Sequence, residues 1–188
     1  MFIQTEQTPN PLTLKFLPGR IVIKEGTAFY KIKSEALNSN LAKKIFTIKG
    51  LSSVFFGTDF ITVTKIEDLV WQTLKSTILG AIMDYYDSVE DTILETSKIK
   101  PSDSKNENPN DTDIVKQIKE LLNTRVRPAV AMDGGDIVYK SFEKGIVYLH
   151  MQGSCAGCPS STATLKMGIE NMLKHYIPEV KEVQPIDA

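Results

Sequence analysis

This sequence has no long hydrophobic run and no excess of charge of one sign. Its uninterrupted apolar stretches, such as residues 21–23, fall far short of the roughly 18 residues that a membrane-spanning helix needs. The 22 Lys and Arg residues nearly balance the 23 Asp and Glu residues, which leaves a net charge of -1. We therefore expect no membrane segment, and neither nucleic acid nor a membrane as a partner, because binding to nucleic acid or anionic lipid usually needs a basic surface.

Cysteine is also scarce, and the amino terminus lacks the features of a targeting segment. Two cysteines in 188 residues exclude a disulfide framework, and a close pair in a reducing compartment more often binds metal or takes part in redox chemistry. The opening residues, MFIQTEQTPNPLTLKF, show neither a charged region followed by an apolar core nor an Arg- and Ser-rich, acid-poor composition. We therefore expect a cytoplasmic protein or a mature organellar form.

A polar segment divides the chain. It reads ETSKIKPSDSKNENPNDTD (residues 95–113), and Ile99 is its only apolar residue. Such a segment cannot bury enough apolar surface to offset the entropy that is lost on ordering, and its prolines disfavour a helix. We therefore predict a flexible linker at residues 91–112, between one domain of residues 1–90 and a second of residues 113–188. Each domain is just large enough for a core of its own.

In the first domain the pattern predicts both strands and helices. Residues 2–4 and 12–17 form short extended segments separated by the turn-forming TPNP, and SSVFFGTDFITVTK predicts a hairpin. Ser34 can cap a helix that carries Leu37, Leu41 and Ile45 on one face, and a second helix spans residues 69–86. We expect Trp71 and the group Phe55, Phe56 and Phe60 to pack in the core, although an exposed phenylalanine would mark a recognition surface.

The second domain begins with a strongly periodic helix from residue 114 to 126, which Pro128 ends or follows. Residues 136–142 and 146–151 predict a hairpin, the last helix starts at Pro159, and a short strand near residues 180–183 closes the sheet. The predicted fold class is mixed α/β (α+β), with two small two-layer domains, the second of order α-β-β-α-β.

Both cysteines lie in the stretch HMQGSCAGCPSSTATLK, where Cys155 and Cys158 form a C-x-x-C pair before Pro159. This pair falls in the turn between a strand and the last helix, with Cys158 at or near the N-cap. Unpaired N–H groups and the helix dipole lower thiol pKa values at such a position, and small neighbours leave the sulfurs accessible. This position is therefore expected to favour the thiolate, which is the form that binds metal and acts as a nucleophile.

Three interpretations of the pair stay open at this point. The cysteines could pack as small hydrophobic residues, although packing explains neither the spacing nor the flanking glycines. They could exchange disulfides, but too few residues follow the last helix to complete a thioredoxin sheet. They could bind metal: two thiolates from each of two identical chains make four ligands, enough for one iron–sulfur cluster or one zinc ion on a two-fold axis.

Longer motifs identify a family. The runs DGGDI (residues 133–137) and GSCAGCPSSTATLKMGIENML (residues 153–173) closely resemble the NifU-like carboxy-terminal domain of the Nfu family of iron–sulfur cluster carriers. The amino-terminal run MFIQTEQTPNPLTLKFLPG, the hairpin and the helix around Trp71 resemble the Nfu amino-terminal domain. The Ala156-Gly157 pair departs from the serine-containing versions that are common in the family.

The resemblance implies that Cys155 and Cys158 bind a [4Fe-4S] cluster shared between the two subunits of a homodimer, which forms when the cluster is loaded. It also implies that an upstream donor loads the cluster, that apo iron–sulfur proteins receive it, and that the first domain contributes to their recognition. A bacterial cytoplasmic protein is expected, with a mature mitochondrial matrix form as the alternative. A zinc-binding dimeric adaptor and a thiol oxidoreductase remain the alternative functions.

The other candidate residues favour structural roles. Gly134 and Gly135 match no phosphate-binding loop and predict a turn into the hairpin. His150 could be an additional ligand but is expected to face solvent or a neighbour, and His175 suits the cationic position at a helix end. Arg125 and Arg127 could dock an acidic partner or simply lie at a solvated helix end. No carboxylate pair or positioned base indicates catalysis, so we do not expect an enzyme.

Overall fold

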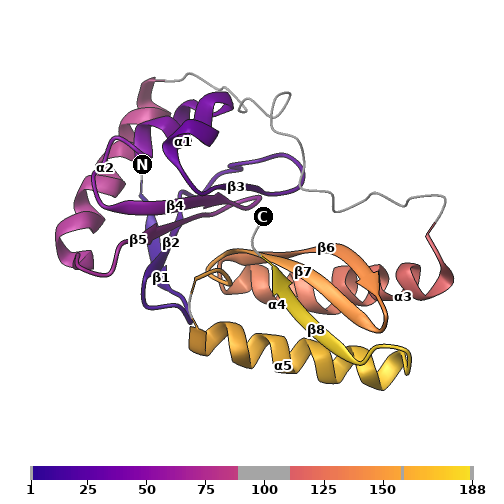
Figure 1. The fold of residues 1–188 in the computed structure, drawn as a ribbon. Helices are drawn as coiled ribbons and strands as arrows, with labels where there is room; N and C mark the ends of the chain where they lie inside the picture. Colours follow the sequence, from indigo (N-terminus) through magenta and orange to yellow (C-terminus); the bar gives the residue numbers. More distant parts are fainter. Residues whose placement is uncertain (1, 89–110, 158, 187–188) are drawn as a thin grey trace.

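The computed structural model describes residues 2–88, 111–157 and 159–186, which form two sheets with helices (Figure 1). The predicted linker, residues 91–112, lies for the most part outside the described residues. We refer to residues 2–88 as the amino-terminal half and to residues 111–186 as the carboxy-terminal half. No helix in the described part of the chain is both long enough and apolar enough to cross a membrane.

The amino-terminal half contains a five-stranded antiparallel sheet of order β1-β2-β5-β4-β3. The strands are β1 (Gln4–Gln7), β2 (Thr13–Leu17), β3 (Ala28–Tyr30), β4 (Leu51–Phe56) and β5 (Ile61–Lys65). The predicted hairpin is confirmed as β4 and β5, whereas β3, a three-residue edge strand, was not predicted. The first extended segment lies about two residues later than expected.

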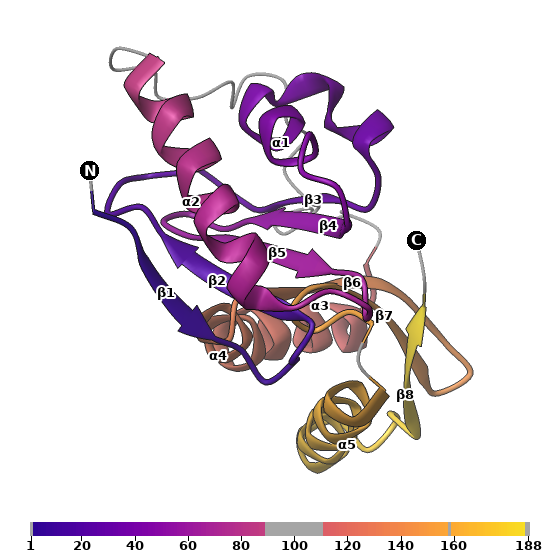
Figure 2. The ribbon, with the colours of Figure 1, turned by 90° about the vertical axis from the view of Figure 1, so that its left-hand side faces the viewer.

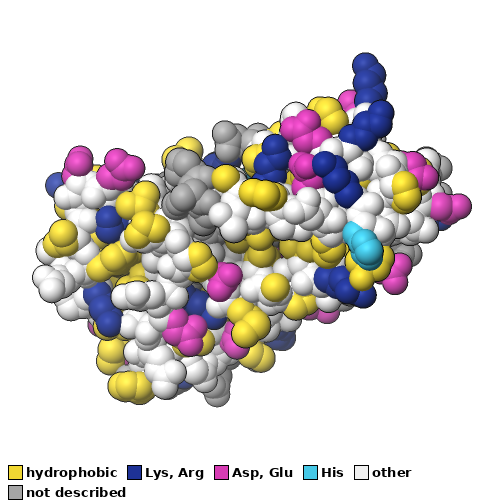
Figure 3. All heavy atoms as spheres, turned by 90° about the horizontal axis from the view of Figure 1, so that it is seen from below, with side chains coloured by type: hydrophobic (Ala, Val, Ile, Leu, Met, Phe, Trp, Pro, Cys, Tyr) yellow, Lys and Arg dark blue, Asp and Glu magenta, His cyan; other side chains and the backbone are white. Residues whose placement is uncertain are grey.

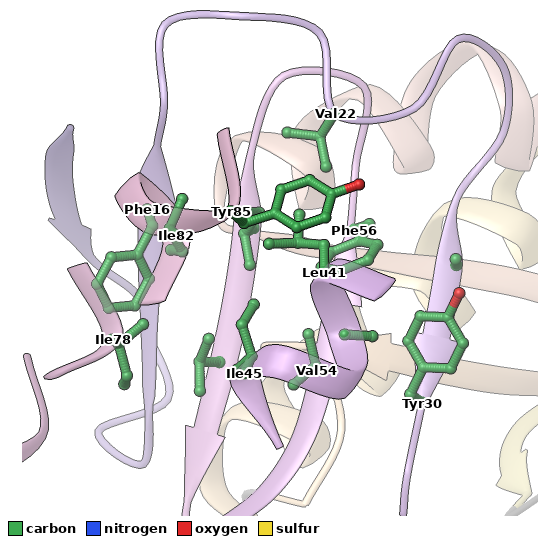
Figure 4. Close-up of a cluster of buried hydrophobic side chains, with 14 of the residues drawn as sticks. Phe16, Val22, Tyr30, Leu41, Ile45, Val54, Phe56, Ile78, Ile82 and Tyr85 are labelled. Atoms are coloured by element: carbon green, nitrogen blue, oxygen red, sulfur yellow. The ribbon is translucent and has the colours of Figure 1, made fainter. Parts of the chain in front are cut away.

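Helices cover one face of this sheet and form the amino-terminal core (Figures 1 and 2). They are the short 3₁₀ helix η1 (Lys33–Asn38), α1 (Asn40–Ile45) and α2 (Trp71–Ser88). Their buried side chains meet alternate residues of the strands, and Figure 4 shows Phe16, Leu41, Val54 and Ile78 among them. Trp71 packs against this cluster, as predicted.

Two details of these helices differ from the prediction. The helix expected from Ser34 is broken, because Ser39 caps a new helix by accepting a hydrogen bond from the Ala42 amide. Leu37 consequently lies on η1 and is 74% exposed, while Leu41 and Ile45 are fully buried. The second helix begins at Trp71, so Val70 precedes it and is 61% exposed.

The carboxy-terminal half has a three-stranded mixed sheet of order β6-β7-β8. Strands β6 (Gly135–Glu143) and β7 (Ile146–Gly153) form the predicted hairpin, and β8 (Glu182–Ile186) pairs parallel to β7. Helices α3 (Asp113–Leu121), α4 (Arg127–Met132) and α5 (Pro159–Tyr176) pack on one face of this sheet. The predicted two-layer α-β-β-α-β order is confirmed.

Pro128 does not end the first helix of this half. The chain continues from α3 through a π-helical segment, η2 (Leu122–Val126), into α4. Pro128 lies in the first turn of α4, where its missing N–H and fixed φ are tolerated. The π-helical segment spaces the backbone hydrogen bonds more widely just before the proline, and the helix therefore extends to Met132 and reaches the turn that precedes β6.

The two sheets face each other between their layers of helices (Figure 1), and strands β4 and β5 contact β7. The molecule is therefore layered helix, sheet, sheet, helix. On the face seen from below in Figure 3, acidic and basic side chains are interspersed with hydrophobic ones.

Candidate functional site

Cys155 lies in the turn between β7 and α5, as the sequence predicts. Strand β7 ends at Gly153, which has a φ of 62°, a left-handed value that favours glycine and turns the chain sharply. Helix α5 begins at Pro159, and the Thr162 hydroxyl donates to the Cys155 carbonyl at 3.3 Å. Cys158 and its predicted N-cap position lie outside the described residues. We call residues 153–157 the cysteine loop.

Gly134 and Gly135 lie directly against the cysteine loop, and we call this pair the glycine floor. Gly134, with a φ of 82°, makes the predicted turn into β6, and its carbonyl accepts a hydrogen bond from the Ser154 amide at 3.2 Å. A Cβ added to Gly135 would lie 2.5 Å from the Cys155 Sγ. The DGGD motif therefore lets the cysteine backbone approach β6 closely and places the thiol directly against it.

The thiol of Cys155 points into the carboxy-terminal core. The residue is 6% exposed and belongs to the same buried cluster as Val130, Ile169 and Leu173. Burial raises the pKa of Cys155 to about 12, although a hydrogen bond with Ser154 acts in the opposite direction. The expectation of an accessible thiol with a lowered pKa is therefore wrong for Cys155, because desolvation disfavours the thiolate.

A cavity of about 440 Å³ borders the cysteine. It lies where the amino-terminal half meets α4, α5 and the cysteine loop, and it is lined by Pro9, Val130, Asp133, Ser154, Cys155, Thr164 and Leu165. Free space beside a soft sulfur donor fits an iron–sulfur cargo. Across the described residues, no three His, Cys, Asp or Glu side chains are grouped so that they could hold a metal ion.

An ion pair fastens the strand beneath this site. Arg127 donates from Nε to Asp136 Oδ1 at 2.7 Å and from Nη2 to Oδ2 at 2.6 Å. The side chain of Asp136 is 4% exposed, and it also accepts from the Ile137 amide and the Thr27 hydroxyl. Arg127 is therefore engaged in a buried, bidentate contact and is not a free, solvated helix end. Arg125 instead stacks on the ring of Tyr176, 4.9 Å from its centroid.

The other candidate residues occupy structural positions. His150 is 6% exposed, pairs through Nδ1 with the Gln152 side chain at 3.2 Å, and packs against Phe29 of the amino-terminal half. It therefore faces a neighbour, as expected. His175 stacks edge-on against Tyr176 in the last turn of α5.

The predicted phenylalanine group is buried but divided between two surfaces. Phe56 belongs to the amino-terminal core, whereas Phe55, with no exposed surface, and Phe60, 6% exposed, lie outside that cluster. Phe55 approaches the cysteine loop, because a Cβ built on Gly153 would lie 3.0 Å from its ring.

Sequence reasoning missed Asn10, a fully buried residue of the amino-terminal half that contacts the cysteine loop. Its Nδ2 donates to the Ala156 carbonyl at 3.0 Å and to the Ser154 carbonyl at 3.4 Å. The TPNP sequence signals a turn at this position, but no local pattern reveals a partner 146 positions away.

Two family models and several known proteins match this chain. Residues 3–89 match the family model described as "Scaffold protein Nfu/NifU N terminal", and residues 118–184 match the "NifU-like domain". The chain is 52% identical to NifU-like protein 4, mitochondrial, of Arabidopsis thaliana over 98% of its own length, and it spans 65% of that protein. It is 50% identical to the human "NFU1 iron-sulfur cluster scaffold homolog, mitochondrial" over 99% of its own length and 72% of that protein.

A solution NMR structure of a NifU-like protein from Saccharomyces cerevisiae is 29% identical and covers 48% of this chain and 82% of its own, with a TM-score of 0.44. The two domain matches and the identities of about 50% over nearly the whole chain are decisive. This chain belongs to the Nfu family of NifU-like scaffold proteins.

Proposed function

We propose that this protein is a non-enzymatic iron–sulfur cluster carrier. It binds a labile [4Fe-4S] cluster through Cys155 and Cys158 and transfers it to apo-proteins. The observation that supports the proposal most directly is the position of Cys155 in a strand-to-helix turn, beside a cavity of about 440 Å³, in a chain whose relatives are named as iron–sulfur cluster scaffolds.

The ligand count favours a site shared by two copies. A [4Fe-4S] cluster held by protein thiolates takes four of them, and one chain supplies two. A two-fold dimer supplies the missing pair, and the cluster is then the principal link between the subunits. Such a cluster is released when the dimer opens, which suits a carrier that receives its cargo from a donor and passes it on.

Loading requires Cys155 to change its surroundings. A ligating thiol must lose its proton, and burial raises the pKa of Cys155 to about 12. Iron replaces that proton and compensates the charge of the thiolate, so the apo form keeps the thiol protonated and protected until cargo arrives. The thiol must also turn outward to meet a second copy.

The names of the relatives support a mitochondrial location for this protein. Both named relatives are mitochondrial proteins, which favours the mitochondrial matrix over the bacterial cytoplasm.

The amino-terminal half contributes to the recognition of recipient proteins, and an upstream donor supplies the cluster.

Anaerobic reconstitution with ferrous iron and sulfide tests the proposal. We expect a brown dimer with a visible sulfur-to-iron charge-transfer band and about four irons per two chains, from the ligand count. Cys155→Ser and Cys158→Ser should each abolish the band and the dimer, whereas Ala156→Ser, which keeps both thiols, should retain them.

Zinc binding and disulfide reduction, measured beside the reconstitution, separate the alternative functions. A colourless protein that binds zinc tightly would replace the cluster interpretation with the zinc adaptor. Catalysed reduction of a disulfide substrate without any cluster would indicate a thiol oxidoreductase.

A further inference from the structure

Four side chains form a continuous row on the outer face of the amino-terminal sheet. Lys15, Thr62, Phe55 and Phe29 are successive cross-strand partners on β2, β5, β4 and β3. Their neighbours along each strand point to the helices, so these four point away from the amino-terminal core. We call them the contact row.

The contact row meets the backbone that supports the cysteine loop. Lys15 Nζ donates to the Met132 carbonyl at 2.9 Å, and the Thr62 hydroxyl donates to the Gly134 carbonyl at 2.7 Å. Its aromatic members reach β7: Phe55 lies against Gly153 and Phe29 against the His150 ring, 6.1 Å between centroids. One face of the amino-terminal half thus contacts both the floor and the start of the cysteine loop.

Asn10 adds the most direct contact. Its Nδ2 donates to the carbonyls of Ser154 and Ala156, the residues on either side of Cys155. Its Oδ1 accepts from the Leu12 amide at 3.0 Å and so keeps the Asn10 turn in shape. The Asn10 side chain therefore joins the two halves: its Nδ2 contacts the cysteine loop, and its Oδ1 contacts the amino-terminal half.

The surfaces that meet here combine the aromatic side chains of the contact row with buried polar ones. Buried between the halves are Lys15, 7% exposed, and Asp136, 3% exposed, together with His150 and Gln152 at 6% and 7%. Polar contact surfaces are typical of domains that associate reversibly, whereas permanent interfaces are more apolar. When the halves separate, water can solvate these polar groups again, which offsets part of the cost of exposing Phe29 and Phe55.

We propose that the outer face of the amino-terminal sheet is a docking surface for the cysteine loop, and that Asn10 is its positioning residue. While the loop is docked, the Cys155 thiol points inward and is not available to a second copy. Undocking frees the loop, so docking and cluster sharing are mutually exclusive. The second part of this statement rests on the proposed function, whereas docking itself does not.

The test measures the alkylation of Cys155 by iodoacetamide in the full chain, with Cys158→Ser so that a single thiol reports. Asn10→Asp keeps the acceptor for Leu12 but replaces the donor with a carboxylate oxygen, which repels the two loop carbonyls. Asn40→Asp is the matched control, because it makes the same charge change at an exposed position at the start of α1. A carboxylate near the loop would by itself slow alkylation, since it raises the thiol pKa.

We expect alkylation of the Asn10→Asp variant to be about tenfold faster, from the loss of two hydrogen bonds, and that of the Asn40→Asp variant to be unchanged. Thr62→Val removes another hydrogen-bond donor, keeps a β-branched side chain and should also accelerate alkylation of Cys155. If Asn10→Asp impairs folding, the rate of the Thr62→Val variant tests the proposal in its place. Unchanged rates in both Asn10→Asp and Thr62→Val would overturn the proposal. A purely structural role for Asn10 would lower the urea midpoint and leave the alkylation rate without urea unchanged, which also overturns it.

Cluster reconstitution of the same variants with Cys158 restored keeps the two proposals distinct. If Asn10→Asp and Thr62→Val accelerate alkylation but no variant binds a cluster, docking is supported and the carrier function is refuted. A cluster in every variant with unchanged alkylation would support the carrier function and refute docking.

Discussion

Replacing Gly135 by alanine tests whether the glycine floor places the thiol. The new Cβ would lie 2.5 Å from the Cys155 Sγ, 2.9 Å from the Gln152 carbonyl oxygen and 3.0 Å from the Cys155 amide nitrogen. Two of these three atoms are backbone, so a side-chain rotation cannot relieve the crowding. The cysteine loop must move away from β6 as a unit.

The magnitude follows from the cost of overpacking, which is about 1–3 kcal/mol for an added methyl group in a filled site. Gly168→Ala is the matched control, because the glycine is exposed within α5 and an added Cβ has nothing within 4 Å. Alanine should stabilise that helix by about 1 kcal/mol. The same chemical change is therefore expected to have opposite signs at the two positions.

Urea denaturation followed by far-ultraviolet circular dichroism measures both effects. With a slope of about 2 kcal/mol/M, the Gly135→Ala variant should unfold at a midpoint about 0.5–1.5 M lower than the parent, and the Gly168→Ala variant at a higher one. Equal midpoints for the parent and Gly135→Ala would refute the contact between Gly135 and the thiol. A lower midpoint for Gly168→Ala would refute the use of that site as an unhindered reference.

Two further predictions concern charge. Arg127→Leu should lower the free energy of unfolding by about 3–5 kcal/mol, because it leaves the carboxylate of Asp136, 4% exposed, without its cation, whereas Lys116→Leu in an exposed pair should change urea stability little. In the Cys158→Ser background, the alkylation rate of Cys155 should rise about tenfold per pH unit from pH 7 to pH 11, because burial raises its pKa from 9.0 to about 12. Because of the raised pKa, the protonated thiol stabilises the fold below pH 9, and this stabilisation is lost as the pH rises towards 12. A plateau of the alkylation rate near pH 9 would contradict the burial of Cys155.

Local patterns predicted the regular elements well where the chain carries a strong period. The hairpins β4-β5 and β6-β7 and the helix α5 follow from alternation, turn residues and Pro159. Strand β3 was not predicted, because three residues are too few to show an alternating pattern. Its pairing with β4 also depends on residues far away in the chain. The helix break at Ser39 was not predicted. A serine within a helical pattern can either continue the helix or cap a new one, and the pattern does not show which of the two occurs.

The candidate site was predicted only in its local parts. The turn between a strand and a helix and the pair of glycines entering β6 are properties of short segments. The surroundings of the thiol are not, because they depend on Gly135, on the packing of α4 and α5, and on a turn at Asn10 far away in the chain. The pKa of Cys155 was expected to fall, and burial raises it.

The sequence by itself determined the position of Cys155 in the chain, the number of thiols available to a cluster, and the family to which the protein belongs, because spacing, composition and motifs are local properties. Tertiary structure alone decided that the thiol of Cys155 points inward and that Asn10 and the contact row hold the cysteine loop. Desolvation and long-range hydrogen bonds arise only when distant segments meet, and no local pattern records which faces of two sheets will lie against each other.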